Sequence, residues 1–179
     1  VAAFQRTARD GVATAHGGSV AYDKLAAKPF RRRAFAGHAF ALEYRAARGH
    51  HYAQFDQRMS RRTREATQPG GCINCHAAEA PGLIAAFGWR GVHAMDYDEL
   101  RGQLAHGMSC ADCHQPGSMA LRVTRPALAQ ALAAQGIALE RASRRELRDY
   151  VCAQCHVEYY FAPEDRTLVL PWAHGRRLE

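Results

Sequence analysis

The chain has 179 residues, a length typical of one domain, and 47% of them are nominally hydrophobic. Much of that share is alanine, so Leu, Ile and Val alone predict only a thin core. Lys and Arg number 24 against 17 Asp and Glu, a formal charge of +7, which would suit nucleic acid, an anionic membrane surface or an anionic cofactor. No apolar run reaches about 18 residues, so we expect no transmembrane helix.

The N-terminal third is expected to be helical. Residues 31–48 are rich in Ala and Arg and are predicted to form one helix. A second helix is expected over residues 51–66, because three apolar side chains recur at helical spacing: Tyr52, Phe55 and Met59. The Gln-Pro-Gly-Gly sequence at residues 68–71 should end this helix just before the first cysteine pair.

The rest of the chain predicts more helices and one short strand. The helices are expected over residues 83–87, from Asp98 through Leu104, from Pro126 to Gly136, and from Ser143 to Val151. Proline suits a first helical turn, glycine suits a helix end, and Ser143 with Glu146 has the form of a capping box. Residues 167–170 are the best strand candidate. We therefore expect a mostly α-helical fold with little strand and, since no linker is visible, a single domain over residues 1–179.

The six cysteines form three Cys-x-x-Cys pairs, and a histidine follows each pair directly. The three motifs are Cys72, Cys75 and His76; Cys110, Cys113 and His114; and Cys152, Cys155 and His156. Zinc sites use such pairs two at a time, which would leave one pair over. A redox dithiol would need a βαβ pattern, which is not visible. The repeated histidine instead indicates c-type haem attachment, in which two thiols bond to the haem and the imidazole binds the iron.

Three bound haems account for the composition in other ways as well. Their propionates would offset most of the positive charge by pairing with arginines, so no nucleic acid partner is needed. Three porphyrins would also supply the buried surface that the side chains lack, giving a multihaem cytochrome c fold organised around the haems. Because c-type attachment takes place outside the bacterial cytoplasm, we expect a periplasmic or otherwise extracytoplasmic mature chain whose signal peptide has been removed.

Seven of the ten histidines remain after three are assigned as proximal ligands. They are His16, His38, His50, His51, His93, His106 and His174. A haem used for electron transfer commonly has a second axial histidine, whereas a haem used for chemistry keeps that position open. Seven spare histidines are enough to fill three irons, so counting alone does not identify an open site.

The segment Cys-Ala-Gln-Cys-His-Val-Glu-Tyr-Tyr-Phe at residues 152–161 closely resembles the ammonia-forming pentahaem cytochrome c nitrite reductases. Several other segments are similar to that family and occur in the same order: Arg48-Gly49-His50 with Tyr52-Ala53, residues 109–114, Thr124-Arg125-Pro126, and Phe161 through Pro171-Trp172. The resemblance runs from about residue 20 to residue 179. It covers the family's N-terminal, three-haem half, and His76 resembles the minority branch in which histidine replaces lysine at the active-site haem.

The resemblance implies a role for each matching residue. The haem on Cys72 and Cys75 would be the active-site haem, with Arg62 as catalytic arginine; its neighbour Arg61 is the residue it could be confused with. Tyr159 would offer its phenol to the substrate pocket and its backbone carbonyl to a calcium ion. Glu158 would bind the same calcium through its side chain. His50 would be the distal ligand of the third haem.

The resemblance also implies what these residues do not supply. The family's other half would carry two more haems, the catalytic histidine, the remaining calcium ligands and the distal histidine of the second haem. A companion chain or self-association would then complete the site, or His93 or His106 would replace that distal ligand. The expected function is six-electron reduction of nitrite to ammonium, with electrons from a quinol dehydrogenase or small cytochrome. The alternative is a non-catalytic triheme electron carrier.

Overall fold

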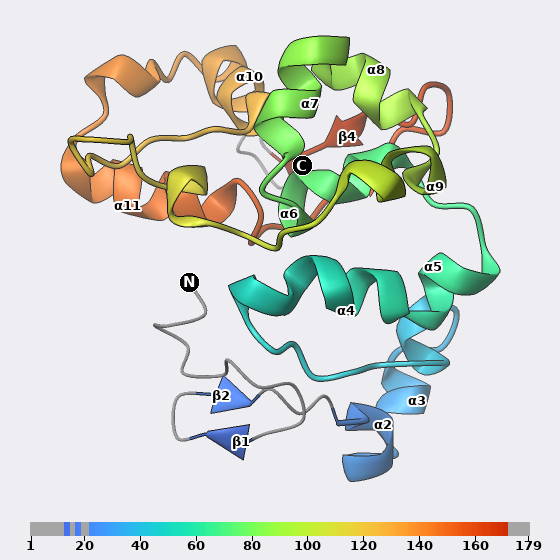
Figure 1. The fold of residues 1–179 in the computed structure, drawn as a ribbon. Helices are drawn as coiled ribbons and strands as arrows, with labels where there is room; N and C mark the ends of the chain where they lie inside the picture. The colour runs from blue at the N-terminus through green and yellow to red at the C-terminus, as the bar shows by residue number, and fades with distance from the viewer. Residues whose placement is uncertain (1–12, 15–16, 19–21, 172–179) are drawn as a thin grey trace.

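The computed structural model describes residues 13–14, 17–18 and 22–171 (Figure 1). Its α-helices are α2 (Lys24–Ala27), α3 (Arg31–Ala34), α4 (Ala53–Met59), α5 (Arg61–Glu65), α6 (Ile73–His76), α7 (Ala80–Phe87), α8 (Trp89–Ala94), α9 (Tyr97–Leu100), α10 (Pro126–Ala134) and α11 (Arg144–Ala153). Short 3₁₀ turns are η1 (Ala39–Ala41), η2 (His50–Tyr52), η3 (Gly70–Cys72), η4 (Arg101–Gln103), η5 (Cys110–Asp112) and η6 (Leu139–Arg141). The prediction of a mostly helical fold with little strand is confirmed.

The described strands form two antiparallel pairs. Strand β1 (Ala13–Thr14) pairs with β2 (Gly17–Gly18), and β3 (Tyr160–Phe161) pairs with β4 (Leu168–Val169). Strand β4 lies within the predicted strand at residues 167–170. Its partner β3 immediately follows the third cysteine motif and Tyr159, so this hairpin fixes the backbone that leads out of that motif.

The single helix predicted over residues 31–48 is wrong. Within that range α3 is the only described α-helix and η1 is a single 3₁₀ turn; between them lies Gly37, whose φ of +88° favours glycine. Ala and Arg are good helix formers, but this stretch has no continuous apolar stripe to bury. Three aromatic rings instead pack against one another with centroid separations of 5.2–5.8 Å: Phe35, Phe40 and Tyr44.

The helix predicted over residues 51–66 is interrupted at Ser60. Ser60 has an extended backbone, with ψ of 142°, so it ends α4 and caps α5. Its hydroxyl accepts a hydrogen bond from the Thr63 amide at 3.4 Å, as expected of an N-cap serine. The interruption turns α5 away from the direction of α4, and this turn decides where Arg61 and Arg62 point.

The later helices agree better with the sequence, because their end signals are stronger. Helix α10 starts at Pro126 and the chain turns at Gly136, with φ of +73°; α11 starts after the Ser143 capping box. Helix α9 is capped by Asp96, two residues before the predicted start at Asp98. Helix α7 begins earlier than predicted, and neither α6 nor α8 was predicted.

The apolar core consists of two small clusters, as the sparse Leu, Ile and Val content implies. The first joins α6 to α9 and contains Ile73, Ala77, Ala80, Leu83, Ile84, Val92, Tyr97, Leu100 and Leu104. The second surrounds α10 and β4 and contains Ala127, Leu128, Ala131, Leu132, Leu168 and Leu170. Cys72 packs against the first cluster, so the first cysteine motif is anchored directly on the core.

Close packing just before Cys72 gives a first prediction. A Cβ atom on Gly70 would overlap the Val92 carbonyl oxygen, so Gly70→Ala is expected to lower the free energy of unfolding by about 1–3 kcal/mol. A Cβ atom on Gly82 in α7 would meet only open space, so Gly82→Ala should raise the free energy of unfolding by about 0.5–1 kcal/mol. Urea unfolding of both variants checks this, and equal effects at the two glycines would contradict it.

Candidate haem-attachment and substrate site

The three cysteine motifs, far apart in the sequence, meet in space. Helix α6 carries the first motif, η5 begins the second, and the end of α11 begins the third. The Asn74 amide nitrogen donates to the Gln154 carbonyl oxygen at 3.1 Å, joining the first and third motifs. The Cys155 thiol donates to the Asn74 carbonyl oxygen at 3.6 Å, a second contact between these two motifs.

Two of the motif histidines are oriented by backbone carbonyl groups. The Nδ1 atom of His76 lies 3.3 Å from the Ala53 oxygen, and Nδ1 of His114 lies 2.8 Å from the Met119 oxygen. A carbonyl oxygen only accepts, so each Nδ1 carries the proton and each Nε2 keeps a lone pair. This is the arrangement of a metal-binding histidine with its second nitrogen hydrogen-bonded, and it fits the chemistry of a haem ligand.

His50 and the third-motif histidine face one another. The ring centroids of His50 and His156 are 6.1 Å apart, with 47° between the ring planes. Two imidazoles bound on opposite sides of one metal, with metal–nitrogen distances of about 2 Å, have centroids about 6 Å apart. The spacing of this pair therefore fits two axial ligands of one iron.

The backbone that presents His50 is fixed by its neighbours. Gly49 has φ of +90° and an extended ψ, a conformation essentially limited to glycine. The guanidinium of Arg48 binds the Asp56 carboxylate at 2.7 Å and lies over the Tyr52 ring at 4.2 Å. The Arg-Gly-His segment is therefore clamped to α4, the same helix that orients His76 through Ala53.

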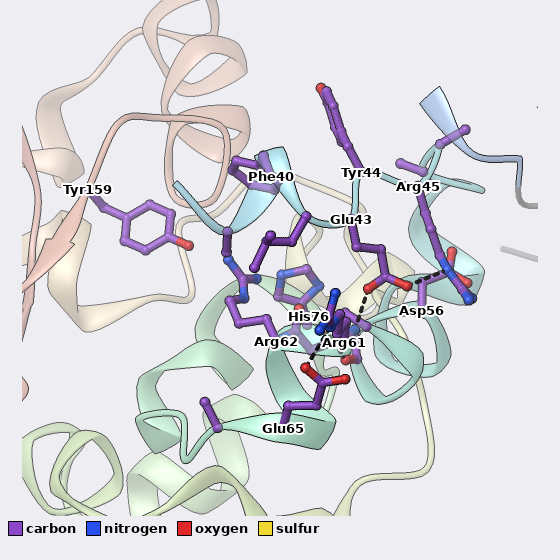
Figure 2. Close-up of a pocket in the computed structure, with 17 residues that line it drawn as sticks. Phe40, Glu43, Tyr44, Arg45, Asp56, Arg61, Arg62, Glu65, His76 and Tyr159 are labelled. Carbon is purple, nitrogen blue, oxygen red and sulfur yellow. Dashed lines mark hydrogen bonds and ion pairs between the residues drawn. The ribbon is translucent and has the colours of Figure 1, made fainter. Parts of the chain in front are cut away.

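A cavity of about 560 Å³ lies beside the first motif (Figure 2). His76, Arg62 and Tyr159 all line it, although they come from α6, α5 and the segment before β3. Much of its wall is made by residues 39–47, including Phe40, Leu42 and Ala46. The structure thus brings together three of the residues that the sequence had suggested for one pocket. The wall formed by residues 39–47 combines apolar side chains with the charged Glu43 and Arg45.

The two neighbouring arginines at the cavity have different surroundings. Arg61 is ion-paired through Nε with Glu65 at 2.6 Å, and its backbone amide donates to Glu43. Arg62 lies with its guanidinium 5.8 Å from the Phe40 ring centroid, and its buried Nε has no hydrogen-bond partner among the described residues. In Figure 2, Arg62 and Tyr159 point toward one another across the cavity. Arg62 is thus the arginine available to a ligand.

Tyr159 reaches the cavity with its phenol protonated. Tyr159 is 44% exposed, and the partial burial of its phenol raises its pKa above the usual value, with the Arg62 charge opposing this. Glu158, the preceding residue, is exposed as well. Among the described residues, His, Cys, Asp and Glu side chains form no group of three that could hold a metal ion. Glu158 therefore belongs to no such group of three among the described residues.

The spare histidines differ in their suitability as iron ligands. His93 is buried, and its Nδ1 accepts the Leu168 amide at 3.2 Å, so Nε2 carries the proton in the neutral ring. This tautomer offers no lone pair at Nε2. His106 is exposed, and its Nδ1 lies 2.7 Å from the Glu79 carboxylate, which leaves Nε2 free. His38 and His51 are exposed, and His16 and His174 lie outside the described residues.

His93 also gives a prediction for pH dependence. Burial lowers the pKa of His93 to about 4, with the Asp165 carboxylate opposing it, whereas an unfolded histidine titrates near 6.5. The unfolded chain therefore binds the extra proton between these values. The free energy of unfolding should fall by about 3 kcal/mol as pH drops from about 6.5 to 4, and be insensitive to His93 above that range.

Urea unfolding at a series of pH values tests this contribution. His93→Gln should flatten the curve between pH 4 and 6.5, because it removes the titrating group. His38→Gln is the matched control, since His38 is exposed. If His93→Gln leaves the pH dependence of the free energy of unfolding unchanged, other groups are responsible for the loss of stability in acid.

Several site residues had not been identified from the sequence. The Ala53 carbonyl acts through its backbone, so no side-chain pattern could reveal it. Phe40 and the rest of residues 39–47 were assigned to a helix, and their role as a cavity wall was missed. The ion pair of Asp56 with Arg48 could have been expected, because Asp56 is the first acid after the Arg-Gly-His segment, eight residues beyond Arg48.

Residues 2–179 match the cytochrome c552 family. The chain belongs to that family. It is 35% identical to cytochrome c-552 of Parabacteroides distasonis, over 98% of this chain and 37% of the relative. It is 34% identical to the cytochrome c nitrite reductase subunit NrfA of Nitratidesulfovibrio vulgaris, over 97% of this chain and 37% of the relative. The chain thus spans little more than a third of the length of these cytochrome c552 relatives.

The fold also resembles a solved member of this group. The catalytic subunit NrfA of cytochrome c nitrite reductase from Desulfovibrio desulfuricans, a protein with two calcium sites, superposes with a TM-score of 0.78 and 29% identity. The match covers 95% of this chain and 41% of that one. Within the described residues, no helix of this cytochrome c552 chain is long and apolar enough to cross a membrane.

Proposed function

We propose that this chain is part of an ammonia-forming nitrite reductase and carries the site where nitrite is reduced to ammonium. One observation carries the proposal: His76, Arg62 and Tyr159 line a single cavity at the first cysteine motif. The family membership and the NrfA relatives support it. The chain would form a single triheme domain over residues 1–179, corresponding to the N-terminal half of the pentahaem family and to its histidine-ligated branch.

The three motifs would each hold one covalently bound haem c. The cysteine pairs would supply the thioether bonds, and His76, His114 and His156 would be the proximal ligands. His50 would be the distal ligand of the third iron, in agreement with its spacing from His156. When bound, the haem on Cys72 and Cys75 supplies the metal and the electrons for nitrite reduction, while the other two relay electrons to it.

The side chains around the cavity would bind and protonate the substrate. Nitrite is an anion, so the Arg62 guanidinium would hold its oxygens by charge and by hydrogen bonds. Tyr159 would donate a hydrogen bond or a proton. Its raised pKa keeps the phenol protonated at neutral pH and makes it a weaker acid, which favours the hydrogen bond over proton transfer.

Calcium would bind through the Glu158 carboxylate and the Tyr159 carbonyl oxygen. Calcium takes six to eight oxygen ligands, so further oxygens must come from outside the described residues or from solvent. The exposure of Glu158 is compatible with such a shared site, and the Desulfovibrio desulfuricans relative has two calcium sites. A cation here would act on the same Tyr159 that lines the cavity.

The rest of the active site would come from outside these residues. Relatives nearly three times as long suggest a companion segment or chain, or self-association, that completes the pocket and supplies the distal ligand of the second haem. His106 fits a replacement for that ligand better than His93, because only His106 leaves Nε2 unprotonated. The redox partner would be a quinol dehydrogenase or a small cytochrome, in the periplasm or another extracytoplasmic space.

Electron paramagnetic resonance of the oxidised, haem-loaded protein tests the proposal. An open iron position in the cavity should give a high-spin ferric signal that changes when nitrite is added, beside a low-spin signal from the third haem that does not. Only low-spin signals, insensitive to nitrite, would instead indicate a triheme electron carrier. In that case His50 and His156 would keep their roles, and Arg62 and Tyr159 would lose theirs.

A further inference from the structure

The residue before the second cysteine is polar and buried in all three motifs. These residues are Asn74, Asp112 and Gln154, and each is only 1% exposed. Haem attachment itself uses the two cysteines and the histidine, so it does not account for a polar side chain at this position. Burial of an amide or carboxylate is unfavourable unless hydrogen bonds satisfy it, so the partners of these three residues indicate their role.

Arg125 is the partner that all three motifs share. It is completely buried, and its Nε donates to the Asn74 carbonyl oxygen at 2.7 Å. Its Nη2 donates to the Asp112 carboxylate at 2.7 Å, and its backbone amide donates to the Gln154 side-chain oxygen at 3.2 Å. One residue outside the motifs therefore contacts the same position in each of them.

The motifs are also joined directly to one another. The Gln154 side-chain nitrogen donates to the Asp112 carbonyl oxygen at 2.9 Å, and the Asn74 side chain donates to the Gln154 carbonyl oxygen. We call Asn74, Asp112, Arg125 and Gln154 the attachment hub. Because every member bonds to at least one other, displacement of one attachment loop would break buried hydrogen bonds to the others.

The hub contains a buried ion pair. The side chains of Arg125 and Asp112 are 0% and 2% exposed. Charges in such an environment are weakly screened and act over longer distances than surface charges. Hub residues also contact a sulfur of every motif: the Asn74 side-chain nitrogen lies 3.5 Å from the Cys75 sulfur, the Gln154 side-chain nitrogen lies 3.9 Å from the Cys113 sulfur, and the Cys155 thiol donates to the Asn74 carbonyl oxygen at 3.6 Å.

We propose that Arg125 is a positioning residue that holds the three haem-attachment loops together, and that its charge, balanced by Asp112, tunes the reduction potentials of more than one haem. The proposal rests on the haem attachment given under the proposed function, but not on nitrite reduction. A haem gains an electron on reduction, so a nearby positive charge raises its potential and a negative charge lowers it.

Opposite charge changes within the hub test this. Four haem-loaded variants are compared with wild type by redox titration followed by optical and paramagnetic resonance spectra: Arg125→Gln, Asp112→Asn, the double variant, and Arg122→Gln. Arg125→Gln leaves the Asp112 carboxylate unbalanced and should lower the potentials of at least two haems. Asp112→Asn should raise them, and the double variant should return toward wild type.

Arg122→Gln is the matched control, because Arg122 contacts only the second attachment loop, through Gln115 and the Ala111 carbonyl oxygen. It should shift at most one haem. Shifts in the same direction for Arg125→Gln and Asp112→Asn would indicate loosened packing and overturn the charge role. Shifts confined to one haem in both would overturn the shared positioning role.

The covalent haem content of each variant, from intact mass, separates the remaining outcomes. Wild type with fewer than three haems would overturn the proposed function and the hub together, whereas three haems with unchanged potentials in every variant would overturn the hub alone. If the Arg125→Gln protein does not accumulate, the direction of the potential shift in Asp112→Asn decides, since asparagine keeps a hydrogen-bonding side chain at that position. A rise supports the proposal, and no change contradicts it.

Discussion

Arg62→Gln in the haem-loaded protein is expected to lower kcat for nitrite reduction about 100- to 1,000-fold, the usual effect of removing one donor that stabilises developing charge. Glutamine keeps a polar side chain but loses the positive charge and the forked donors that suit two oxygens. Steady-state kinetics with a reduced dye as electron donor would measure this. Haem content and low-spin signals should stay unchanged, because Arg62 contacts no cysteine motif histidine through a hydrogen bond.

Arg61→Gln provides the matched control for this effect. Arg61 is the preceding residue on the same helix, but its side chain is paired with Glu65 at the surface. Removing an exposed pair of this kind costs only about 0.2–1 kcal/mol of stability, so kcat should change little. A larger loss of kcat for Arg61→Gln than for Arg62→Gln would contradict this assignment and show that Arg61 binds the substrate.

His50→Gly is expected to convert the third haem from low-spin to high-spin iron. The His50 ring lies opposite His156 at a spacing that fits two axial ligands, and glycine leaves that side of the iron without a protein ligand. Electron paramagnetic resonance should show loss of one low-spin signal and gain of a high-spin one. Added imidazole should bind in the space and restore the low-spin signal, which a general disturbance of the fold would not allow.

His51→Ala controls for the loss of a histidine from the same turn. His51 packs edge-on against Tyr52, with ring centroids 4.7 Å apart, and belongs to the same 3₁₀ turn as His50. The low-spin signals of this variant should match those of wild type. If His51→Ala, and not His50→Gly, changes the third haem, the assignment within the Arg-Gly-His-His segment is reversed.

The parts of the fold that could be predicted are those set by local signals. Pro126 and Gly136 bound a helix through their backbone restrictions alone, and the Ser143 capping box fixes the start of α11. The cysteine spacing is equally local, because two thiols and an imidazole must reach one cofactor from a single turn. Each of these signals lies within a few residues of the feature it determines.

The parts that could not be predicted depend on contacts distant in the sequence. Residues 31–48 have good helix propensity, yet the aromatic cluster of Phe35, Phe40 and Tyr44 holds them in another form. Ser60 ends α4 although no proline or glycine stands there, and its side chain caps a new helix through Thr63. The choice between Arg61 and Arg62 then depends on this interruption, which sets the direction of α5.

The attachment hub has a consequence for the order of biosynthesis. Asn74 and Gln154 are 80 residues apart in the chain, yet they are direct hydrogen-bond partners. We expect haem attachment outside the cytoplasm, so a chain that crosses the membrane N-terminus first would present the first cysteine pair there before the third motif. Until the third motif follows, the Asn74 side chain has no Gln154 carbonyl oxygen to bind. The thiols of the first pair would then be accessible to an attachment enzyme, and the loop that carries them would close only after the last motif has crossed.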